Sequence, residues 1–289
     1  MRIVVTGGAG FVGSAIVRRL LESKHHVRVL DDLSTGRVAN IMGLACDFEQ
    51  IDAGKADYAN ANAIVHAAAY PDVSANWKHP SERERQWQSN AELTRRILDR
   101  VPSGVPFVLL STCSVYGGGV VDERSLVRAT SPYAASKIAA EALVMAYHEA
   151  QRVRAAVLRL VNVVGPRYAH GHLADFVRQV KATGKLHALD DGVKRKSFVH
   201  VDDVADAVEN ALVAPGGRVA NVTSEVLWSW RDSVAVMQAM KGAFPVTCEA
   251  RPSGWVGDPD ELKVTPYGFG WCKRSIVEGV AQSLRDCGW

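Results

Sequence analysis

The sequence lacks the features that mark secreted, membrane and nucleic-acid-binding proteins. Its five cysteines, at positions 46, 113, 248, 272 and 287, are odd in number and scattered, which predicts reduced thiols and a cytoplasmic location. The opening apolar stretch is a short run that ends in glycines, so we expect neither a signal peptide nor a membrane span. The 34 basic and 31 acidic residues nearly balance, and no basic run with interleaved aromatics suggests nucleic acid as a partner.

Metal ligands, repeats and linkers are also scarce. His170-Gly-His172 is the only His-x-His pattern, and no third ligand of matching type lies nearby, so no metal site is expected. The chain has no internal repeat, low-complexity tract or flexible linker. Its 289 residues, 47% of them hydrophobic, suffice for one large α/β domain with a smaller lobe.

Strands and helices are expected to alternate through the first half of the chain. The candidate strands are 2–6, 27–30, 63–67, 105–110 and 155–160, and the candidate helices are 11–23, 83–101 and 133–151. This alternation predicts a Rossmann-type, doubly wound parallel sheet. After residue 166 we expect a short helix at 173–183, a cationic turn at 190–196, and strands 198–201 and 219–222 that return to the sheet around a helix at 202–213.

The first strand leads into a glycine-rich loop, Gly7-Gly-Ala-Gly10-Phe-Val-Gly13, which a helical pattern follows. Glycines at these spacings allow a tight turn and close approach of the backbone to a pyrophosphate, which the helix dipole attracts. The second strand ends in Asp31, about twenty residues further on, where a carboxylate can bind both ribose hydroxyls and repel a 2′-phosphate. Because no Arg immediately follows Asp31, the sequence favours NAD over NADP, although Arg37 is near enough to keep NADP open.

Two further segments carry groups suited to proton transfer. The apolar strand at 105–110 delivers Ser111 and Thr112 at its carboxyl end, where ligands bind in open α/β sheets. Tyr133 and Lys137 are four residues apart, so they share one face of a helix that Ser131 would cap and Pro132 would begin. An ammonium near the phenol favours phenolate and lowers the pKa of Tyr133 from its usual value of about 10. A general base is therefore predicted at Tyr133.

Taken together, eight segments in order resemble the extended short-chain dehydrogenase/reductases, within their sugar-nucleotide epimerase group. The segments are Thr6-Gly-Gly-Ala-Gly-Phe-Val-Gly13, Asp31-Asp-Leu-Ser-Thr-Gly36, Val65-His-Ala-Ala-Ala69, Asn90 with Thr94, Ser111-Thr112 before Val115-Tyr-Gly117, Tyr133 to Lys137, Arg159 to Arg167, and Phe198 to Asp203. The resemblance covers nearly the whole chain. It implies an NAD-binding Rossmann domain at 1–165 and 198–226 and a discontinuous substrate-binding lobe at 166–197 and 227–289.

The resemblance also implies which residues contact NAD. The positions carried over are Gly7, Gly10, Phe11, Val12, Asp31, Leu33, Ser34, Thr35, Gly36, Asp47, Phe48, Ala67, Ala68, Ala69, Asn90 and Ser111, together with Tyr133 and Lys137. Asp47 would meet the adenine amino group and Phe48 its ring. His66 is interpreted as a packed histidine at the end of a strand rather than as a catalyst.

The implied activity is epimerisation at C4 of a nucleoside-diphosphate sugar, most simply UDP-glucose/UDP-galactose or a close relative. Tyr133 takes the proton of the C4 hydroxyl, Lys137 lowers the phenol's pKa and binds the nicotinamide ribose, and Thr112 bonds the same oxygen. The hydride passes to NAD and returns to the other face of a transient 4-keto sugar. Thr112, Asn162, Arg195, Lys196 and Arg251 would bind the substrate, with Lys196-Ser197 departing from the family's usual Arg-Asp.

Other functions remain open at this stage. A 4,6-dehydratase would need an acid pair directly after Thr112, where the chain has Cys113 and Ser114. A glucuronate decarboxylase would need acid and guanidinium groups that the sequence does not place. An NAD(P)-dependent sugar-nucleotide ketoreductase and a non-catalytic dinucleotide-sensing protein are the remaining alternatives. The resemblance further implies a homodimer in which helices 83–101 and 133–151 pair across a two-fold axis.

Overall fold

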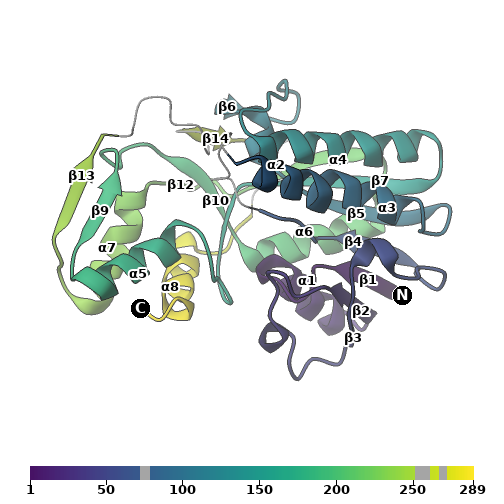
Figure 1. Ribbon diagram of the computed structural model, residues 1–289, viewed down its shortest axis with the longest axis horizontal. Helices are drawn as coiled ribbons and strands as arrows, with labels where there is room; N and C mark the ends of the chain where they lie inside the picture. The colour runs from purple at the N-terminus through teal and green to yellow at the C-terminus, as the bar shows by residue number, and fades with distance from the viewer. Residues whose placement is uncertain (72–78, 251–260, 267–271) are drawn as a thin grey trace.

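The computed structural model describes residues 1–71, 79–250, 261–266 and 272–289. A parallel sheet with helices on both faces occupies the larger part of the molecule, and a smaller lobe extends from one end of it (Figure 1). The chain's N-terminus lies at the far side of the large sheet, and its C-terminus lies in the smaller lobe (Figure 1).

Seven strands form the large sheet, and every pairing within it is parallel. Their order is β11-β7-β5-β4-β1-β2-β3. Their bounds are β1 (Arg2–Thr6), β2 (His26–Asp31), β3 (Asp47–Gln50), β4 (Ala63–His66), β5 (Val105–Thr112), β7 (Val153–Leu160) and β11 (Arg218–Val222). The strand order reverses between β1 and β4, and ligands of such sheets bind outside the carboxyl ends at this point.

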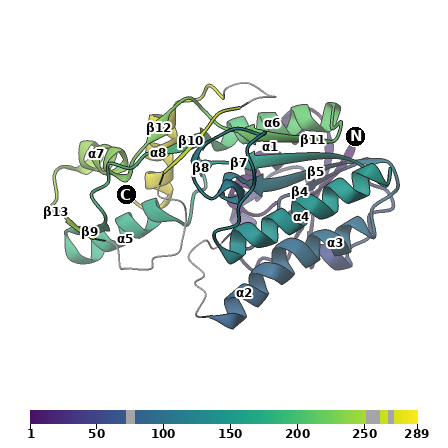
Figure 2. The same ribbon diagram turned by 90° about the horizontal axis from the view of Figure 1, so that it is seen from above.

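Helices cover both faces of this sheet (Figure 2). On one face lie α1 (Phe11–Glu22) and α6 (Val201–Val213), whose apolar residues share a core with β1, β2 and β5. On the other face lie α3 (Leu93–Leu98) and α4 (Pro132–Glu149), which share a second core with β4, β5 and β7. Because both faces are covered, the strands read as continuous β-branched and apolar runs, such as Ile3-Val4-Val5.

Two further sheets lie outside the large one, and the smaller lobe contains the second of them. One has the order β12-β10-β14-β6, with β8 paired to β10, and the other consists of β9 and β13. The strands are β6 (Gly119–Val121), β8 (Asn162–Val164), β9 (Leu186–Leu189), β10 (Lys196–His200), β12 (Leu227–Trp228), β13 (Val246–Glu249) and β14 (Leu262–Val264). The helices of this lobe are α5 (His172–Thr183), α7 (Trp230–Lys241) and α8 (Ile276–Asp286), which share a third core.

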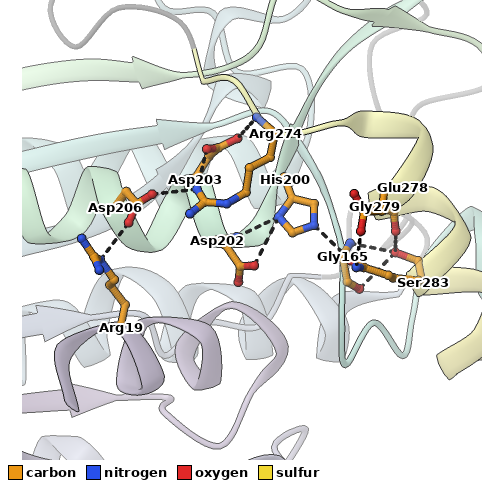
Figure 3. Close-up of polar contacts among 11 residues, drawn as sticks. Arg19, Gly165, His200, Asp202, Asp203, Asp206, Arg274, Glu278, Gly279 and Ser283 are labelled. Atoms are coloured by element: carbon orange, nitrogen blue, oxygen red, sulfur yellow. Dashed lines mark hydrogen bonds and ion pairs between the residues drawn. The ribbon is translucent and has the colours of Figure 1, made fainter. Parts of the chain in front are cut away.

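The last helix meets the rest of the chain at a close-packed contact (Figure 3). His200 Nδ1 accepts a hydrogen bond from the Asp202 amide at 3.2 Å and so caps α6, while its Nε2 lies 3.1 Å from Gln282 Oε1 on α8. A Cβ at Gly279 would lie 2.8 Å from the His200 ring, so only glycine lets α8 approach this closely. Ser283 Oγ accepts a hydrogen bond from the Gly165 amide at 2.8 Å.

Beside this contact runs a set of charged side chains that we call the seam network: Arg19, Asp203, Asp206, Glu209 and Arg274. Arg274 binds Asp203 and Asp206, both at 2.6 Å, and Arg19 binds Asp206 and Glu209, both at 2.8 Å. The network therefore joins α1, α6 and the segment before α8 (Figure 3).

Most of the elements expected from the sequence are present, with three differences. The helix expected at 83–101 is α2 (Pro80–Gln86), a π-helical stretch η3 (Trp87–Glu92) and α3 in succession. The strands β3, β6, β8, β9, β12, β13 and β14 were not anticipated. The strand expected at 198–201 does not join the large sheet, because β10 pairs with β8, β12 and β14, whereas β11 does join it. Within the described residues, no helix combines the length and the apolar character needed to cross a membrane.

Candidate active site

The glycine-rich loop packs against the neighbouring strand so tightly that side chains are excluded. Gly7 has a φ of +69°, and a Cβ there would lie 2.6 Å from the Ala68 backbone. A Cβ at Gly13 would lie 2.1 Å from the Gly7 carbonyl oxygen. Gly10 begins α1 without any side-chain cap, which leaves the first amides of the helix to an outside acceptor. This cradle fits a pyrophosphate.

Asp31 lies at the end of β2, next to the glycine loop, and is only 7% exposed. Its carboxylate accepts hydrogen bonds from the amides of Ala9 and Leu33, both at 2.9 Å. Burial raises the pKa of Asp31, and these two N–H groups oppose that effect. A Cβ at Gly36 would lie 2.6 Å from Asp31 Oδ1, so glycine keeps the space beside the carboxylate open. The arrangement suits a ribose diol. Arg37 is exposed and bonds the Ala9 carbonyl through its backbone.

Asp47 and Phe48 lie elsewhere than the resemblance implies. In the parallel register Asp47 lies beside Arg28, whereas Gln50 lies beside Asp31 at the ligand-binding edge. Three residues of strand separate Asp47 from that edge, a distance of about 10 Å. The geometry therefore does not support adenine contacts by this pair. Ile51, whose amide donates to the Asp31 carbonyl at 3.1 Å, is the residue that reaches the edge.

The segment Ala67-Ala68-Ala69 follows β4 and forms the wall opposite Gly7. The Ala67 amide donates to the Thr6 carbonyl, and the Ala68 amide donates to Thr6 Oγ1 at 3.3 Å. His66 precedes these alanines and is buried between Thr6 Oγ1, at 2.7 Å, and Thr94 Oγ1, at 3.0 Å. Burial, with the charge of Lys137, lowers the pKa of His66 to about 3. A neutral, fully bonded imidazole of this kind agrees with the packing role expected for it.

Asn90 lies in the π-helical stretch η3 and is 1% exposed. Its Oδ1 accepts from the Tyr70 amide at 2.8 Å, and its Nδ2 donates to Ser136 Oγ at 2.9 Å and to the Tyr70 carbonyl at 3.3 Å. Both donor hydrogens are therefore used inside the protein. Asn90 positions α4 and the chain after β4, and the structure does not support a direct amide contact to NAD.

Tyr133 and Lys137 lie in the first two turns of α4, as expected. Ser131 Oγ accepts from the Ala134 amide at 3.1 Å, and Pro132 begins the helix. Tyr133 is 8% exposed and Lys137 is 3% exposed. Lys137 Nζ donates to the Leu110 carbonyl at 2.6 Å, which ties α4 to β5. Burial lowers the pKa of Lys137 to about 8, and the charge of Glu141 opposes this effect.

Ser111 and Thr112 end β5 directly after Leu110, whose carbonyl accepts the hydrogen bond of Lys137 from the second turn of α4. Thr112 Oγ1 accepts from the Ser114 amide at 3.1 Å, and Thr112 itself is 9% exposed. Cys113 has no exposed surface and its thiol faces the Arg159 carbonyl and Asn221. Burial raises the pKa of Cys113 well above its usual value.

Beneath these hydroxyls lies a set of buried polar side chains that we call the floor network: Ser111, Tyr116, Glu141, Arg159 and Asn221. The Ser111 hydroxyl donates to Glu141, and Glu141 pairs with Arg159 at 2.7 Å. Arg159 donates to Tyr116 Oη at 2.9 Å, and Tyr116 Oη donates to Asn221 Oδ1 at 2.9 Å. Glu141 was not predicted as a site residue, although its position one helical turn after Lys137 places it on the same face of the helix.

The residues expected to bind substrate come together only in part. Asn162 begins β8 and donates to the Ser197 carbonyl at 3.3 Å, which places it beside Lys196 on β10. Arg195 precedes Lys196, is exposed, and donates to the Leu227 carbonyl at 3.2 Å. Arg251 lies outside the described residues.

Comparisons with known proteins agree with this geometry. Residues 3–223 match the model of the NAD dependent epimerase/dehydratase family. The chain is 32% identical to UDP-glucose 4-epimerase of Mycolicibacterium smegmatis, covering 100% of this chain and 93% of that protein. It is 33% identical to dTDP-glucose 4,6-dehydratase of Streptomyces niveus, covering 77% of this chain and 71% of that protein.

The fold has the same relatives among solved structures. UDP-glucuronic acid 4-epimerase of Bacillus cereus, in complex with NAD, superposes with a TM-score of 0.85 at 22% identity, covering 100% of this chain and 99% of that one. The cradle of glycines, the held Asp31 carboxylate and the family match point to the same cofactor. The chain belongs to the NAD dependent epimerase/dehydratase family, and NAD is its cofactor.

Proposed function

We propose that this enzyme inverts C4 of a nucleoside-diphosphate sugar through a transient 4-keto intermediate, with UDP-glucose/UDP-galactose or a close relative as its substrate. The observation that carries the proposal is the hydrogen bond from Lys137 to the Leu110 carbonyl, which brings the start of α4 to the end of β5. Tyr133 lies one turn before Lys137 on α4, Thr112 follows Leu110 by two residues, and no acid follows Thr112. The M. smegmatis relative, which matches over the full chain, bears the name of this activity.

Each residue has one task in the proposed reaction. Bound NAD supplies a hydride acceptor that also returns the hydride. The Tyr133 oxygen takes the proton from the C4 hydroxyl as the hydride leaves, and gives it back when the hydride returns to the other face. Lys137 stabilises the phenolate by its charge, and the Thr112 hydroxyl bonds the reacting oxygen. The proton and the hydride are both returned, so the cycle has no net redox change.

The dehydratase relative makes the positions after Thr112 decisive. A dehydratase must protonate and deprotonate carbons next to the ketone, which needs titratable side chains there. Cys113 is wholly buried, with its pKa raised by that burial, and Ser114 carries a hydroxyl. Neither is suited to acid–base work on a sugar. This favours epimerisation over dehydration.

The substrate's diphosphate is proposed to lie against Asn162, Lys196 and Arg195, with Arg251 as a further candidate. Asn162 and Lys196 lie on adjacent strands, and the Arg195 guanidinium is exposed beside them. Lys196 is a point charge, so Arg195 would supply the planar fork that bonds two phosphate oxygens.

The proposal includes an arrangement of parts and an assembly. We propose residues 1–165 and 198–226 as the NAD-binding part and 166–197 and 227–289 as the substrate-binding part, with β8 and β10 forming the border between them. We also propose a cytoplasmic homodimer formed by α4 and by the succession of α2, η3 and α3, in which Trp87 of η3 is 49% exposed. Light scattering at micromolar concentration should give twice the chain mass, and a monomeric mass would contradict the assembly.

The test of the activity is a panel of UDP-, dTDP-, GDP- and CDP-sugars given to protein with confirmed bound NAD. We expect one epimer pair to equilibrate without added reductant. Tyr133→Phe keeps the ring but removes the titrating oxygen, and it should lower the rate by roughly 10² to 10⁴ while NAD remains bound. A net consumption of reduced cofactor, with release at each turnover, would indicate a ketoreductase instead. No epimerisation across the panel would refute the proposal.

A further inference from the structure

Glu141 is a buried carboxylate that the proposed chemistry does not use, although it lies among the groups that do. It is 6% exposed, accepts a hydrogen bond from the Ser111 hydroxyl, and stands one helical turn after Lys137 on α4. The charge of Glu141 favours the ammonium form of Lys137. The carboxylate therefore bonds the Ser111 hydroxyl of β5 and acts by its charge on the cation of α4.

The charge of Lys137 is sensitive to its surroundings because the side chain is buried. Its hydrogen bond to the Leu110 carbonyl is to a neutral group. Burial lowers the pKa of Lys137 to about 8, close to working pH, and the Glu141 charge opposes that effect. An ammonium that lost its proton would no longer stabilise a phenolate at Tyr133.

The other titratable groups around Lys137 do not replace Glu141. His66 on β4 is neutral, because burial and the Lys137 charge lower its pKa to about 3. Burial raises the pKa values of Cys113 and Tyr116, so both stay protonated near neutral pH. Arg159 on β7 is a cation and would act against the Lys137 ammonium if it were not paired.

Arg159 fixes the Glu141 carboxylate by three hydrogen bonds. Its Nε lies 3.1 and 3.2 Å from the two carboxylate oxygens, and its Nη2 lies 2.7 Å from Oε2. Tyr116 Oη accepts from Nη1 on the far side, and the guanidinium carbon lies 4.9 Å from the Tyr116 ring centre. The carboxylate therefore cannot turn away from Ser111 and Lys137 without breaking this set of bonds.

We propose that Glu141 is a positioning residue of the active site: its carboxylate holds the Ser111 hydroxyl and supplies the negative charge that the buried Lys137 ammonium needs to act on Tyr133. This inference rests on the proposed function in that Tyr133 is the base. Glu141 itself touches neither the sugar nor the cofactor in this scheme, and its effect on Tyr133 passes through Lys137.

The test measures the phenolate absorbance of Tyr133 in the NAD-loaded enzyme without any sugar, as the difference between each protein and its Tyr133→Phe counterpart. Glu141→Gln combined with Arg159→Met removes both charges together and keeps an amide oxygen for Ser111. The phenolate absorbance rises with pH, and we call this rise the phenolate limb. We expect the limb to move to higher pH by about one unit, because Lys137 loses its proton at a lower pH when the charge of Glu141 is removed. Circular dichroism and retained NAD report whether the variant has folded.

Lys137→Met is the control that separates an effect through Lys137 from a direct one. In a Lys137→Met background, adding Glu141→Gln with Arg159→Met should leave the limb where it is. The inference is overturned if the double substitution does not move the phenolate limb in the protein that keeps Lys137. It is also overturned if the limb moves to higher pH by the same amount with Lys137 and with Lys137→Met. Because the loss of a carboxylate by itself would favour phenolate, a direct effect of Glu141 has the opposite sign.

Glu141→Asp gives an independent readout should the combined variant fail to fold. It keeps the charge and the pairing with Arg159 but shortens the reach to Ser111, so the limb should stay in place while kcat falls. A shift as large as that of Lys137→Met would overturn the inference. If the phenolate limb moves as expected but no sugar of the panel is epimerised, the role of Glu141 is supported and the proposed function is refuted. Absence of any Tyr133 limb in the wild-type protein would refute both.

Discussion

The floor network and the seam network contain the same kinds of charged side chain at nearly the same distances. Arg159 lies 2.7 Å from Glu141, and Arg274 lies 2.6 Å from Asp203. Their surroundings differ: the side chains of Arg159 and Glu141 are each 8% exposed, whereas Arg274 is 42% exposed and Arg19 is 39% exposed. Distance alone therefore does not separate the two networks, and solvent access does.

The difference decides what each network can do. In the floor network water cannot replace a lost partner, so each charge depends on the other and on the hydroxyls bonded to it. In the seam network water and salt reach the Arg19 and Arg274 guanidiniums, although Asp203 is buried, so the contribution of a single pair is small. A buried network can therefore set the charge state of a catalytic lysine, while an exposed one joins elements with little influence on chemistry.

The largest effect is expected from breaking the floor pair on one side. Arg159→Met removes the guanidinium and leaves the Glu141 carboxylate buried without its cation. We expect the free energy of unfolding to fall by about 3 to 5 kcal/mol, measured by urea denaturation. Adding Glu141→Gln should restore part of that loss, because no unpaired charge then remains. A loss of less than about 1 kcal/mol in the single variant would make the floor equivalent to an exposed pair.

The free energy of unfolding should also depend on pH, because His66 is buried near the floor network. Its pKa is about 3 in the folded protein, against about 6.5 when unfolded. Between these values the unfolded chain binds a proton that the folded protein does not. This contribution to stability is therefore complete above about pH 6.5 and is lost as pH falls towards 3.

The measurement for His66 is the slope of stability against pH below 6.5. His66→Asn removes the titrating ring, so its slope should be shallower than that of the wild-type protein. His26→Asn, at an exposed position of β2, serves as the matched control and should leave the slope unchanged. Equal slopes in all three proteins would mean that His66 takes up its proton in the folded state as readily as in the unfolded chain.

The large sheet was predictable because its signals are local. A buried β-branched run, a glycine loop and a helical pattern follow one another within the first 22 residues, and the parallel order then follows from the crossover rule. The short strands outside the large sheet gave no such signal. The strands β8, β12 and β14 are two or three residues long, and β10 pairs with partners that are distant in sequence. Short runs of this kind carry no periodicity that could assign them to a sheet.

Part of the candidate site was likewise predictable from the sequence, and part was not. The start of α4 lies against the end of β5, where Lys137 bonds the Leu110 carbonyl, and the spacing and capping residues predict the helix that carries Tyr133 and Lys137. The position of Asp47 away from the ligand-binding edge and the internal bonds of the Asn90 amide have causes that spacing does not reveal. The position of Asp47 depends on the register of a four-residue strand, and the amide of Asn90 is consumed by Tyr70 and Ser136.

In the seam region, packing should matter more than charge. Gly279→Ala adds a Cβ that would lie 2.8 Å from the His200 ring and 3.0 Å from Val164 Cγ2. We expect a loss of about 1 to 3 kcal/mol in the free energy of unfolding, because α8 must shift away from β8 and β10. Gln282→Ala removes the bond to His200 and an exposed bond to Glu278, and it should cost about 0.5 to 1.5 kcal/mol. If Gly279→Ala unfolds no more easily than the wild-type protein, α8 is not held by close packing.

The smallest effect is expected from Arg274→Met, which empties the centre of the seam network while keeping an apolar stem against α6. Arg274 bonds two carboxylates at 2.6 Å, but its side chain is 42% exposed, and the buried Asp203 keeps a hydrogen bond from the residue 274 amide at 3.0 Å. Water and this amide therefore replace most of what is lost. The free energy of unfolding should fall by no more than about 1 kcal/mol.

The difference between Arg274→Met and the wild-type protein should shrink as ionic strength rises from about 0.01 to 1 M, because the screening length falls from about 30 to 3 Å. The same salt series applied to Arg159→Met should leave its deficit nearly unchanged, since salt does not reach a buried pair. Parallel salt responses in the two variants would contradict the distinction between the networks.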